Sequence, residues 1–222
     1  ADMVLKGKLS LDDQLIKYLP DTLKFKDENF RKIKLEYLAT HTSGLMKLNN
    51  DLVSEKDEWE APGKYLMYTN YKDFFVSLEN INLIDEPGRT YEYSNDNLAL
   101  LSYVICSASG KNLKELFTQY YFKPFNMDNS MLKVSNDQKK NFATAYRRPG
   151  FQTMQWDNFE EKTYLGAGAL KSTTKDQLTF LRNLFYEKSD LTEAAKFATK
   201  VYFDSTQAIY KMGLGWLIME MQ

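Results

Sequence analysis

The sequence predicts a mostly helical α+β domain, and three patterns support this fold class. Apolar residues recur at intervals of three and four from Leu98 to Ile105 and again from Leu178 to Leu184, which is typical of buried helix faces. Residues 209–219 instead alternate around two glycines, which favours a strand or hairpin edge. The length of 222 residues and the hydrophobic content of 43% suit one domain or two intimate lobes.

The first helices are expected to be short, because glycine and proline delimit them. Residues 1–6 have the pattern of a helix end, which Gly7 closes in a left-handed conformation. The earlier turns of such a helix are expected before residue 1. Asp12 or Asp13 is expected to open the next helix, which stops before Pro20.

An apolar stripe at positions 33–38 predicts a helix that leads into His41 and stops at Gly44. His41 is the only histidine, so its role has two interpretations. At a helix end an imidazole can satisfy terminal carbonyl oxygens, which is the interpretation that we favour. A Ser-His-Asp arrangement with Ser43 or Ser94 is the alternative.

The rest of the chain alternates between predicted helices and turns. Glu86-Pro87-Gly88 predicts a turn that delivers Tyr93, and Asn95 or Asp96 is expected to cap the helix that follows and ends at Gly110. Loops are expected at 47–63 and, with short strands, at 129–157. Further helices are expected at 71–78, 113–121, 173–184 and 191–201.

Composition excludes several classes of function. The formal net charge of −1 offers no field that would gather nucleic acid, and residues 98–108 are too short an apolar run to cross a bilayer of about 30 Å. One histidine and one cysteine provide no metal-ligand cluster, and Gly166-Ala167-Gly168 is too short for a dinucleotide fingerprint. We therefore expect no metal and no nucleotide cofactor, and we expect Cys106 to be a buried small hydrophobe. Residues 1–4 do not have the pattern of an export leader, so we expect any export signal to have been removed or never to have been present.

Seven motifs in register carry a resemblance over almost the whole chain. They are Gly7–Asp13, Tyr18-Leu19-Pro20, Thr40–Leu45, Pro87-Gly88, Tyr93-Ser94-Asn95, Gly166–Thr173 and Gly213–Trp216. Their order and spacing resemble the class C β-lactamase-like family, which includes penicillin-binding proteins and esterases. Members carry a Ser-x-x-Lys, a Tyr-x-Asn and a Lys or His followed by Ser/Thr and Gly. The second element alone is present, at Tyr93 and Asn95.

The resemblance implies a β-lactamase/transpeptidase-like α+β fold, in which a helical lobe packs beside an antiparallel sheet. Residues 1–222 are then an incomplete domain, with the helical lobe at about 14–162 and sheet-associated portions at both ends. The first element is expected just before Ala1 and the third shortly after Gln222. Such a piece is expected to expose an apolar face that the rest of the sheet covers.

The resemblance also implies a serine hydrolase that cleaves an amide or ester of a cell-wall peptide or small metabolite through an acyl-enzyme, outside the cytoplasm. Tyr93 would act as general base and Asn95 would hydrogen-bond the missing lysine or the substrate amide. A free phenol titrates near about 10, so the base needs adjacent positive charge. The 222-residue chain alone is therefore expected to be inactive. The alternative is a non-catalytic ligand-binding or regulatory protein, and the oligomeric state stays open.

Two literal Ser-x-x-Lys strings compete with that assignment. Ser130 to Lys133 lies where no helix is expected, so the lysine need not face the serine. Ser172 to Lys175 opens a predicted helix, but Thr173 with an aspartate three residues later has the spacing of a capping box. We interpret both strings as structural.

Overall fold

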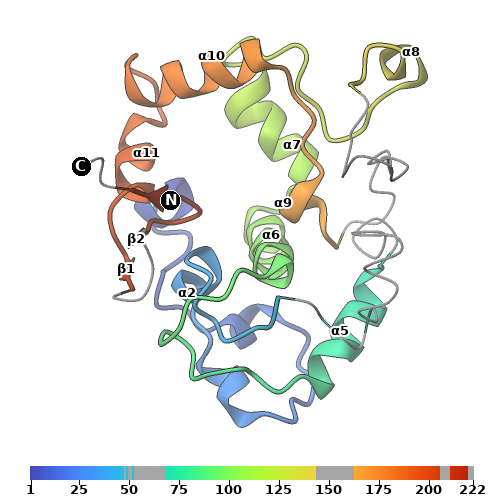
Figure 1. Cartoon of the computed structure of the whole chain (residues 1–222), viewed down its shortest axis with the longest axis vertical. Helices are drawn as coiled ribbons and strands as arrows, with labels where there is room; N and C mark the ends of the chain where they lie inside the picture. The colour runs from blue at the N-terminus through green and yellow to red at the C-terminus, as the bar shows by residue number, and fades with distance from the viewer. Residues whose placement is uncertain (48, 50–51, 53–68, 144–162, 206–210, 220–222) are drawn as a thin grey trace, which may run out of the picture.

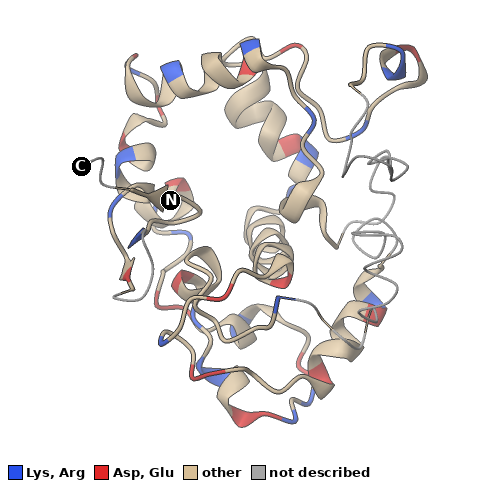
Figure 2. Ribbon diagram, in the orientation of Figure 1, with Lys and Arg blue, Asp and Glu red and all other residues tan. Residues whose placement is uncertain are grey.

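The structure is a computed structural model that describes residues 1–47, 49, 52, 69–143, 163–205 and 211–219. Helix α6 (Asn95–Ser109) lies near the centre, and shorter helices surround it (Figure 1). Acidic and basic residues are interspersed along the ribbon (Figure 2).

The other described elements are mostly short. In chain order they are α1 (Asp2–Leu5), the 3-10 helices η1 (Leu15–Tyr18) and η2 (Glu28–Lys32), α2 (Leu35–Ala39), α5 (Tyr71–Asn80), α7 (Leu113–Phe117), the π-helical turn η3 (Thr118–Phe122), α8 (Asn136–Lys139), α9 (Leu165–Gly168), α10 (Thr174–Phe185), α11 (Thr192–Ala198), β1 (Phe203–Asp204), β2 (Lys211–Met212) and β3 (Leu217–Ile218). The helices predicted at 71–78, 113–121, 173–184 and 191–201 are confirmed as α5, α7 with η3, α10 and α11.

The sheet is small and antiparallel, with strand order β1-β2-β3. Phe203 pairs with Met212, and Met212 pairs in turn with Leu217. The hairpin predicted at 209–219 is therefore confirmed, while β1 had no alternating pattern that would have announced it.

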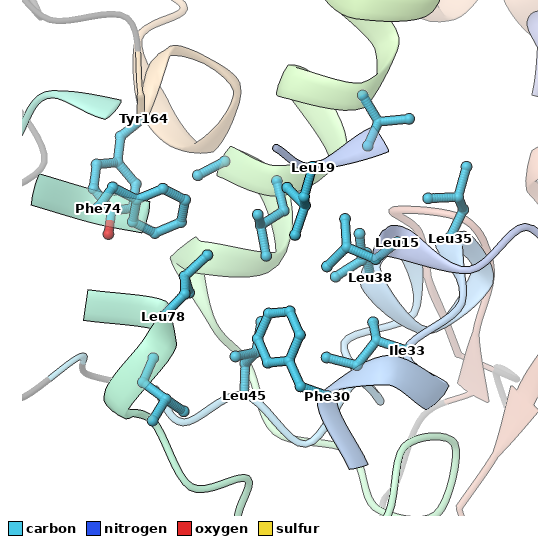
Figure 3. Close-up of a cluster of buried hydrophobic side chains, with 14 of the residues drawn as sticks. Leu15, Leu19, Phe30, Ile33, Leu35, Leu38, Leu45, Phe74, Leu78 and Tyr164 are labelled. Carbon is cyan, nitrogen blue, oxygen red and sulfur yellow. The ribbon is translucent and has the colours of Figure 1, made fainter. Parts of the chain in front are cut away.

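The main core surrounds α6 (Figure 3). Of the apolar positions predicted to form the buried face of α6, Val104 is fully buried, whereas Leu98, Leu101 and Ile105 are only partly buried. The predicted face is therefore confirmed in part, but Ala99 and Leu100, which lie outside the predicted stripe, are fully buried as well. The reason is that α6 packs against α2 and α9 together, so the covered part of its surface is wider than one apolar stripe.

The small residues at 166–168 allow α9 to approach α6, as predicted. A Cβ atom added to Gly166 would lie 2.5 Å from the Cβ atom of Ser102 and 2.9 Å from the carbonyl oxygen of Leu98. Glycine is needed there because any side chain would push the two helices apart.

A second apolar cluster joins η3, α10 and α11. Its buried members are Phe125, Met127, Leu184, Leu191 and Ala195. Of the three leucines predicted on the face of α10, only Leu184 is buried. Leu178 and Leu181 are exposed, and Phe185 adds to the apolar surface that they form.

Two predicted helix ends were wrong. Helix α2 ends at Ala39, and the first left-handed residue after it is His41 with φ 57°, before Gly44 with φ 82°. Gly44 instead allows the chain to pass the carbonyl oxygen of Asp85, with which a Cβ atom would collide. Helix η1 has Gln14 as its N-cap, because the Asp13 carboxylate is bonded to other groups and no side chain caps this end.

Other predictions are confirmed or tested only in part. Gly7 has the predicted left-handed conformation, with φ 66° after α1. In the predicted loop with short strands at 129–157, the described part holds α8 and an isolated bridge between Met131 and Lys171. Residues 144–157, and most of the loop predicted at 47–63, lie outside the described residues.

Candidate functional site

Tyr93 lies at the surface immediately before the central helix, and 44% of its area is exposed. The peptide NH of the preceding residue, Glu92, donates to the carbonyl oxygen of His41 (2.8 Å). On its inner side the Tyr93 ring lies against the His41 ring, with a centroid distance of 4.7 Å. Tyr93 is therefore partly exposed to solvent, and the turn that carries it is hydrogen-bonded to the backbone at His41.

Asn95 is the first residue of α6, so the prediction that Asn95 or Asp96 caps this helix was wrong. The N-cap is Ser94, whose extended backbone (φ −141°, ψ 131°) makes no side-chain capping bond. Asn95 is half-buried beside Tyr93 in the chain. The two candidate catalytic residues therefore lie next to the first turn of one helix, and Ser94, Asp96 and Asn97 around them are buried.

The His41 ring does not bind helix carbonyl oxygens, which corrects the sequence-based interpretation. Its Nδ1 atom lies 3.2 Å from the backbone nitrogen of Ser94 and 3.2 Å from Nδ2 of Asn97. The Ser43 hydroxyl donates to Oδ1 of Asn97 (2.5 Å) rather than to the imidazole. Ser94 Oγ is buried without a hydrogen-bond partner among the described residues. Neither serine forms the hydroxyl–imidazole pair that a Ser-His-Asp arrangement needs.

Asp96 is buried one residue after Asn95, with 2% of its area exposed. Its carboxylate accepts hydrogen bonds from the Tyr164 hydroxyl (2.6 Å) and from Nδ2 of Asn49 (3.2 Å). The same Asn49 amide also donates to the Ser77 hydroxyl (2.9 Å). Burial is the main cause that raises the pKa of Asp96 to about 6, and the two hydrogen bonds partly oppose it. The network joins the start of α6 to α5 and to the residue before α9.

Sequence reasoning missed the roles of His41, Asp96 and Asn97. One available signal was the run Asn95-Asp96-Asn97, because a helix start uses one polar cap and two further polar residues need partners elsewhere. The partners lie 47 to 68 residues away in the chain, so no local pattern could identify them.

Both rival Ser-x-x-Lys strings meet in one structural cluster. The Ser130 hydroxyl donates to the Asp176 carboxylate (2.8 Å) and lies 2.7 Å from the Ser172 hydroxyl. Thr173 is the N-cap of α10 and accepts from the Asp176 NH, as predicted. The Asp176 carboxylate departs from a capping box, because it binds Ser130 and the NH of Asn129 instead. These contacts support the structural interpretation of the two strings.

Two cavities lie away from Tyr93. One of about 300 Å³ borders α1, α6 and α7 and is lined mainly by apolar side chains such as Leu101, Ile105 and Phe117. The other, of about 550 Å³, includes half-buried Cys106. Cys106 is thus half-buried rather than buried as predicted, although partial burial raises the pKa of its thiol and favours the protonated form.

Within the described ranges, histidine, cysteine, aspartate and glutamate side chains form no group that could hold a metal ion. Among the helices of the same ranges, none combines the length and the apolar character needed to cross a membrane. The candidate site is the surface turn at Tyr93 and Asn95 with the buried polar groups beneath it, His41, Asp96 and Asn97.

The family model described as Beta-lactamase matches residues 1–222, and the chain therefore belongs to the β-lactamase family. Among curated relatives, it is 26% identical over 237 residues to the D-alanyl-D-alanine-carboxypeptidase/endopeptidase AmpH of Escherichia coli K12, covering 99% of this chain and 58% of AmpH. It is also 26% identical to the putative penicillin-binding protein PbpX of Bacillus subtilis, over 94% of this chain and 47% of PbpX. The chain thus spans about half the length of these relatives.

Solved structures show the same fold. A class C β-lactamase superposes with a TM-score of 0.76 at 23% identity, over 97% of this chain and 54% of that enzyme. A β-lactamase/D-alanine carboxypeptidase from Pseudomonas syringae superposes with a TM-score of 0.73 at 20% identity, over 96% and 54%. These likenesses confirm the predicted β-lactamase/transpeptidase-like α+β fold.

Proposed function

We propose that the longer protein containing this chain is a serine hydrolase that cleaves amides or esters through an acyl-enzyme. The observation that carries the proposal is the exposed Tyr93 side chain, which precedes the N-cap of α6, two residues before Asn95 at the first position of that helix. Membership of the β-lactamase family supports it, as do relatives named as a carboxypeptidase and a penicillin-binding protein. A β-lactam, a D-alanyl-D-alanine peptide or an ester is the proposed substrate, in an exported protein.

In the proposed reaction Tyr93 moves a proton. A serine hydroxyl from a Ser-x-x-Lys element attacks the substrate carbonyl, and Tyr93 in its phenolate form accepts the hydroxyl proton. The ammonium of the lysine in that element stabilises the phenolate. The proton then passes to the leaving amine or alcohol, and water later hydrolyses the acyl-serine. Asn95 orients the lysine or the substrate amide by hydrogen bonding.

The division of the domain is part of the same proposal. Residues 14–162 form most of the helical lobe, residues at both ends belong with the sheet, and the Ser-x-x-Lys and third elements lie outside residues 1–222. The exposed apolar side chains of α10, Leu178, Leu181 and Phe185, support a further part of the fold that covers them.

The test replaces Tyr93 by Phe in the longer protein. Loss of general base catalysis is expected to lower the rate of acylation by a chromogenic cephalosporin or a p-nitrophenyl ester by about 10²- to 10⁴-fold. Tyr186→Phe is the matched control, because Tyr186 is 88% exposed and lies beyond the end of α10. A Tyr93→Phe variant as fast as the wild type would contradict the role of the phenol.

The isolated 222-residue chain is expected to gain no mass when incubated with the same reagents, as read by intact-protein mass spectrometry. A stoichiometric adduct would show that the nucleophile lies within residues 1–222. If the longer protein binds a β-lactam without acylation, it is a ligand-binding member of the family.

A further inference from the structure

His41 lies directly behind the candidate catalytic turn. It is 5% exposed, and its ring packs against the rings of Tyr93 and Tyr91, at centroid distances of 4.7 Å and 6.1 Å. Its carbonyl oxygen accepts the NH of Glu92, and its Nδ1 atom lies against the NH of Ser94. His41 therefore contacts the backbone on both sides of Tyr93.

The contacts determine the tautomer of the imidazole. A backbone NH can only donate, so the Nδ1 atom that faces the NH of Ser94 is an acceptor and the ring proton is on Nε2. The amide of Asn97 fits this assignment. Its Oδ1 atom accepts from the Ser43 hydroxyl, so its Nδ2 atom is the one that points at Nδ1 of His41.

The surroundings keep the ring neutral. Burial lowers the pKa of His41 to about 4, and in the described part of the chain the phenol rings of Tyr91 and Tyr93 contact the imidazole. The backbone of His41 has φ 57°, a left-handed conformation in which histidine, asparagine and aspartate are enriched among non-glycine residues. A strained conformation at a buried ring requires a compensating interaction, and the shared hydrogen bonding at Nδ1 provides it.

We propose that His41 is a positioning residue, whose neutral imidazole fixes the Tyr93–Asn95 turn through Nδ1, where one lone pair is shared between the NH of Ser94 and the amide of Asn97. The clamp, defined as His41 with the NH of Ser94 and the amide of Asn97, holds the Tyr93 ring in place. Its effect on catalysis rests on the proposed function, whereas its existence does not.

The protonation state and tautomer of His41 can be measured without assignment of other histidines, because His41 is the only histidine in the chain. Long-range ¹H–¹⁵N NMR of the 222-residue chain is expected to show the Nε2–H tautomer, with protonation midpoint near pH 4. The amide proton of Ser94 and the side-chain amide of Asn97 are expected to shift with that same midpoint. An Nδ1–H tautomer, or a midpoint near 6.5, would overturn the proposal.

Asn97→Asp provides a sharper perturbation. A carboxylate beside Nδ1 favours a proton on that nitrogen, so the histidine midpoint is expected to rise above 6.5 and the Ser94 NH to lose its acceptor. Asn80→Asp is the matched control, because it adds the same charge at the exposed end of α5. An unchanged midpoint in Asn97→Asp would also overturn the clamp.

A pair of variants in the longer protein links the clamp to activity. His41→Asn retains an acceptor and tolerates the left-handed backbone, whereas His41→Phe retains a ring without an acceptor. We expect His41→Phe to lower kcat for a p-nitrophenyl ester by about 10- to 100-fold with KM little changed, and His41→Asn to recover most of the loss. Equal activity of a folded His41→Phe variant and the wild type would refute the positioning role. If the wild type hydrolyses nothing, the proposed function fails, and the NMR measurements still decide whether the clamp exists.

Discussion

The N-terminal ends of α6 and α10 are built from similar residues but held in different ways. Each follows a hydroxyl N-cap with an extended backbone, Ser94 or Thr173, and each has an aspartate that is 2% exposed, Asp96 or Asp176. At α10 the hydroxyl of the cap, Thr173, accepts a hydrogen bond from the NH of Asp176 in the first turn of the helix. At α6 the hydroxyl of the cap, Ser94, has no hydrogen-bond partner among the described residues, and the backbone NH of Ser94 donates to His41, 53 residues away.

The difference shows how the position of an exposed side chain, here Tyr93, can be fixed by hydrogen bonds of its buried neighbours. At α10 the Asp176 carboxylate takes the NH of Asn129 and the hydroxyl of Ser130, which closes the helix start. At α6 the bonds lie beneath the turn, so the outward side of Tyr93 stays accessible. A helix start supported from behind is suited to present a reactive group.

The largest expected effect lies at α10. Asp176→Ala removes the acceptor of the Asn129 NH and the charged acceptor of the Ser130 hydroxyl, which is then left with the hydroxyl of Ser172. We expect the free energy of unfolding to fall by about 3 kcal/mol, measured by urea denaturation. The exposed Asp190→Ala is the control and should change it by less than about 0.5 kcal/mol. Equal effects of the two substitutions would show that the buried bonds at α10 contribute little.

The corresponding aspartate of α6 is expected to make stability depend on pH. Burial raises the pKa of Asp96 from 3.8 to about 6, so the folded state binds more protons than the unfolded state between these values. Ionisation of Asp96 therefore destabilises the fold as pH rises from about 4 to 6, by up to about 3 kcal/mol. Asp96→Asn cannot ionise and avoids this loss.

The measurement compares urea unfolding of wild type and Asp96→Asn from pH 4.5 to 7.5. The difference between them is expected to move in favour of the variant as pH rises. The depressed pKa of His41 acts in the opposite direction, since its stabilising effect grows with pH, but it is common to both proteins and cancels. A difference that stays constant with pH would mean that Asp96 is not buried as a carboxylate.

The smallest effect separates the two caps directly. Thr173→Ala removes a side-chain acceptor from the NH of Asp176 and is expected to cost about 1 kcal/mol. Ser94→Ala removes a buried hydroxyl without a partner among the described residues, so stability is expected to stay the same or rise slightly. Thermal unfolding of the two variants beside the wild type tests this order, and a larger loss in Ser94→Ala would reverse the comparison.

Local patterns predicted local features well. The left-handed Gly7, the Thr173 cap and the hairpin near 209–219 were each confirmed, because turn chemistry and alternation act over a few residues. The close approach at Gly166 was also confirmed. The predicted end of α2 was wrong because His41, and not Gly44, is the first residue after the helix with a left-handed backbone. Contacts with residues 92–97 stabilise this conformation of His41.

The sequence by itself determined the mostly helical α+β class, the motifs that mark the family, and Tyr93 and Asn95 as the candidate site. Only the tertiary structure decided how the turn that carries them is supported. Burial and hydrogen bonding across 47 to 68 residues of chain bring His41, Asn49 and Tyr164 to the start of α6. The physical reason is that a buried polar group must be satisfied by whatever the fold places beside it, and sequence spacing does not record that neighbour.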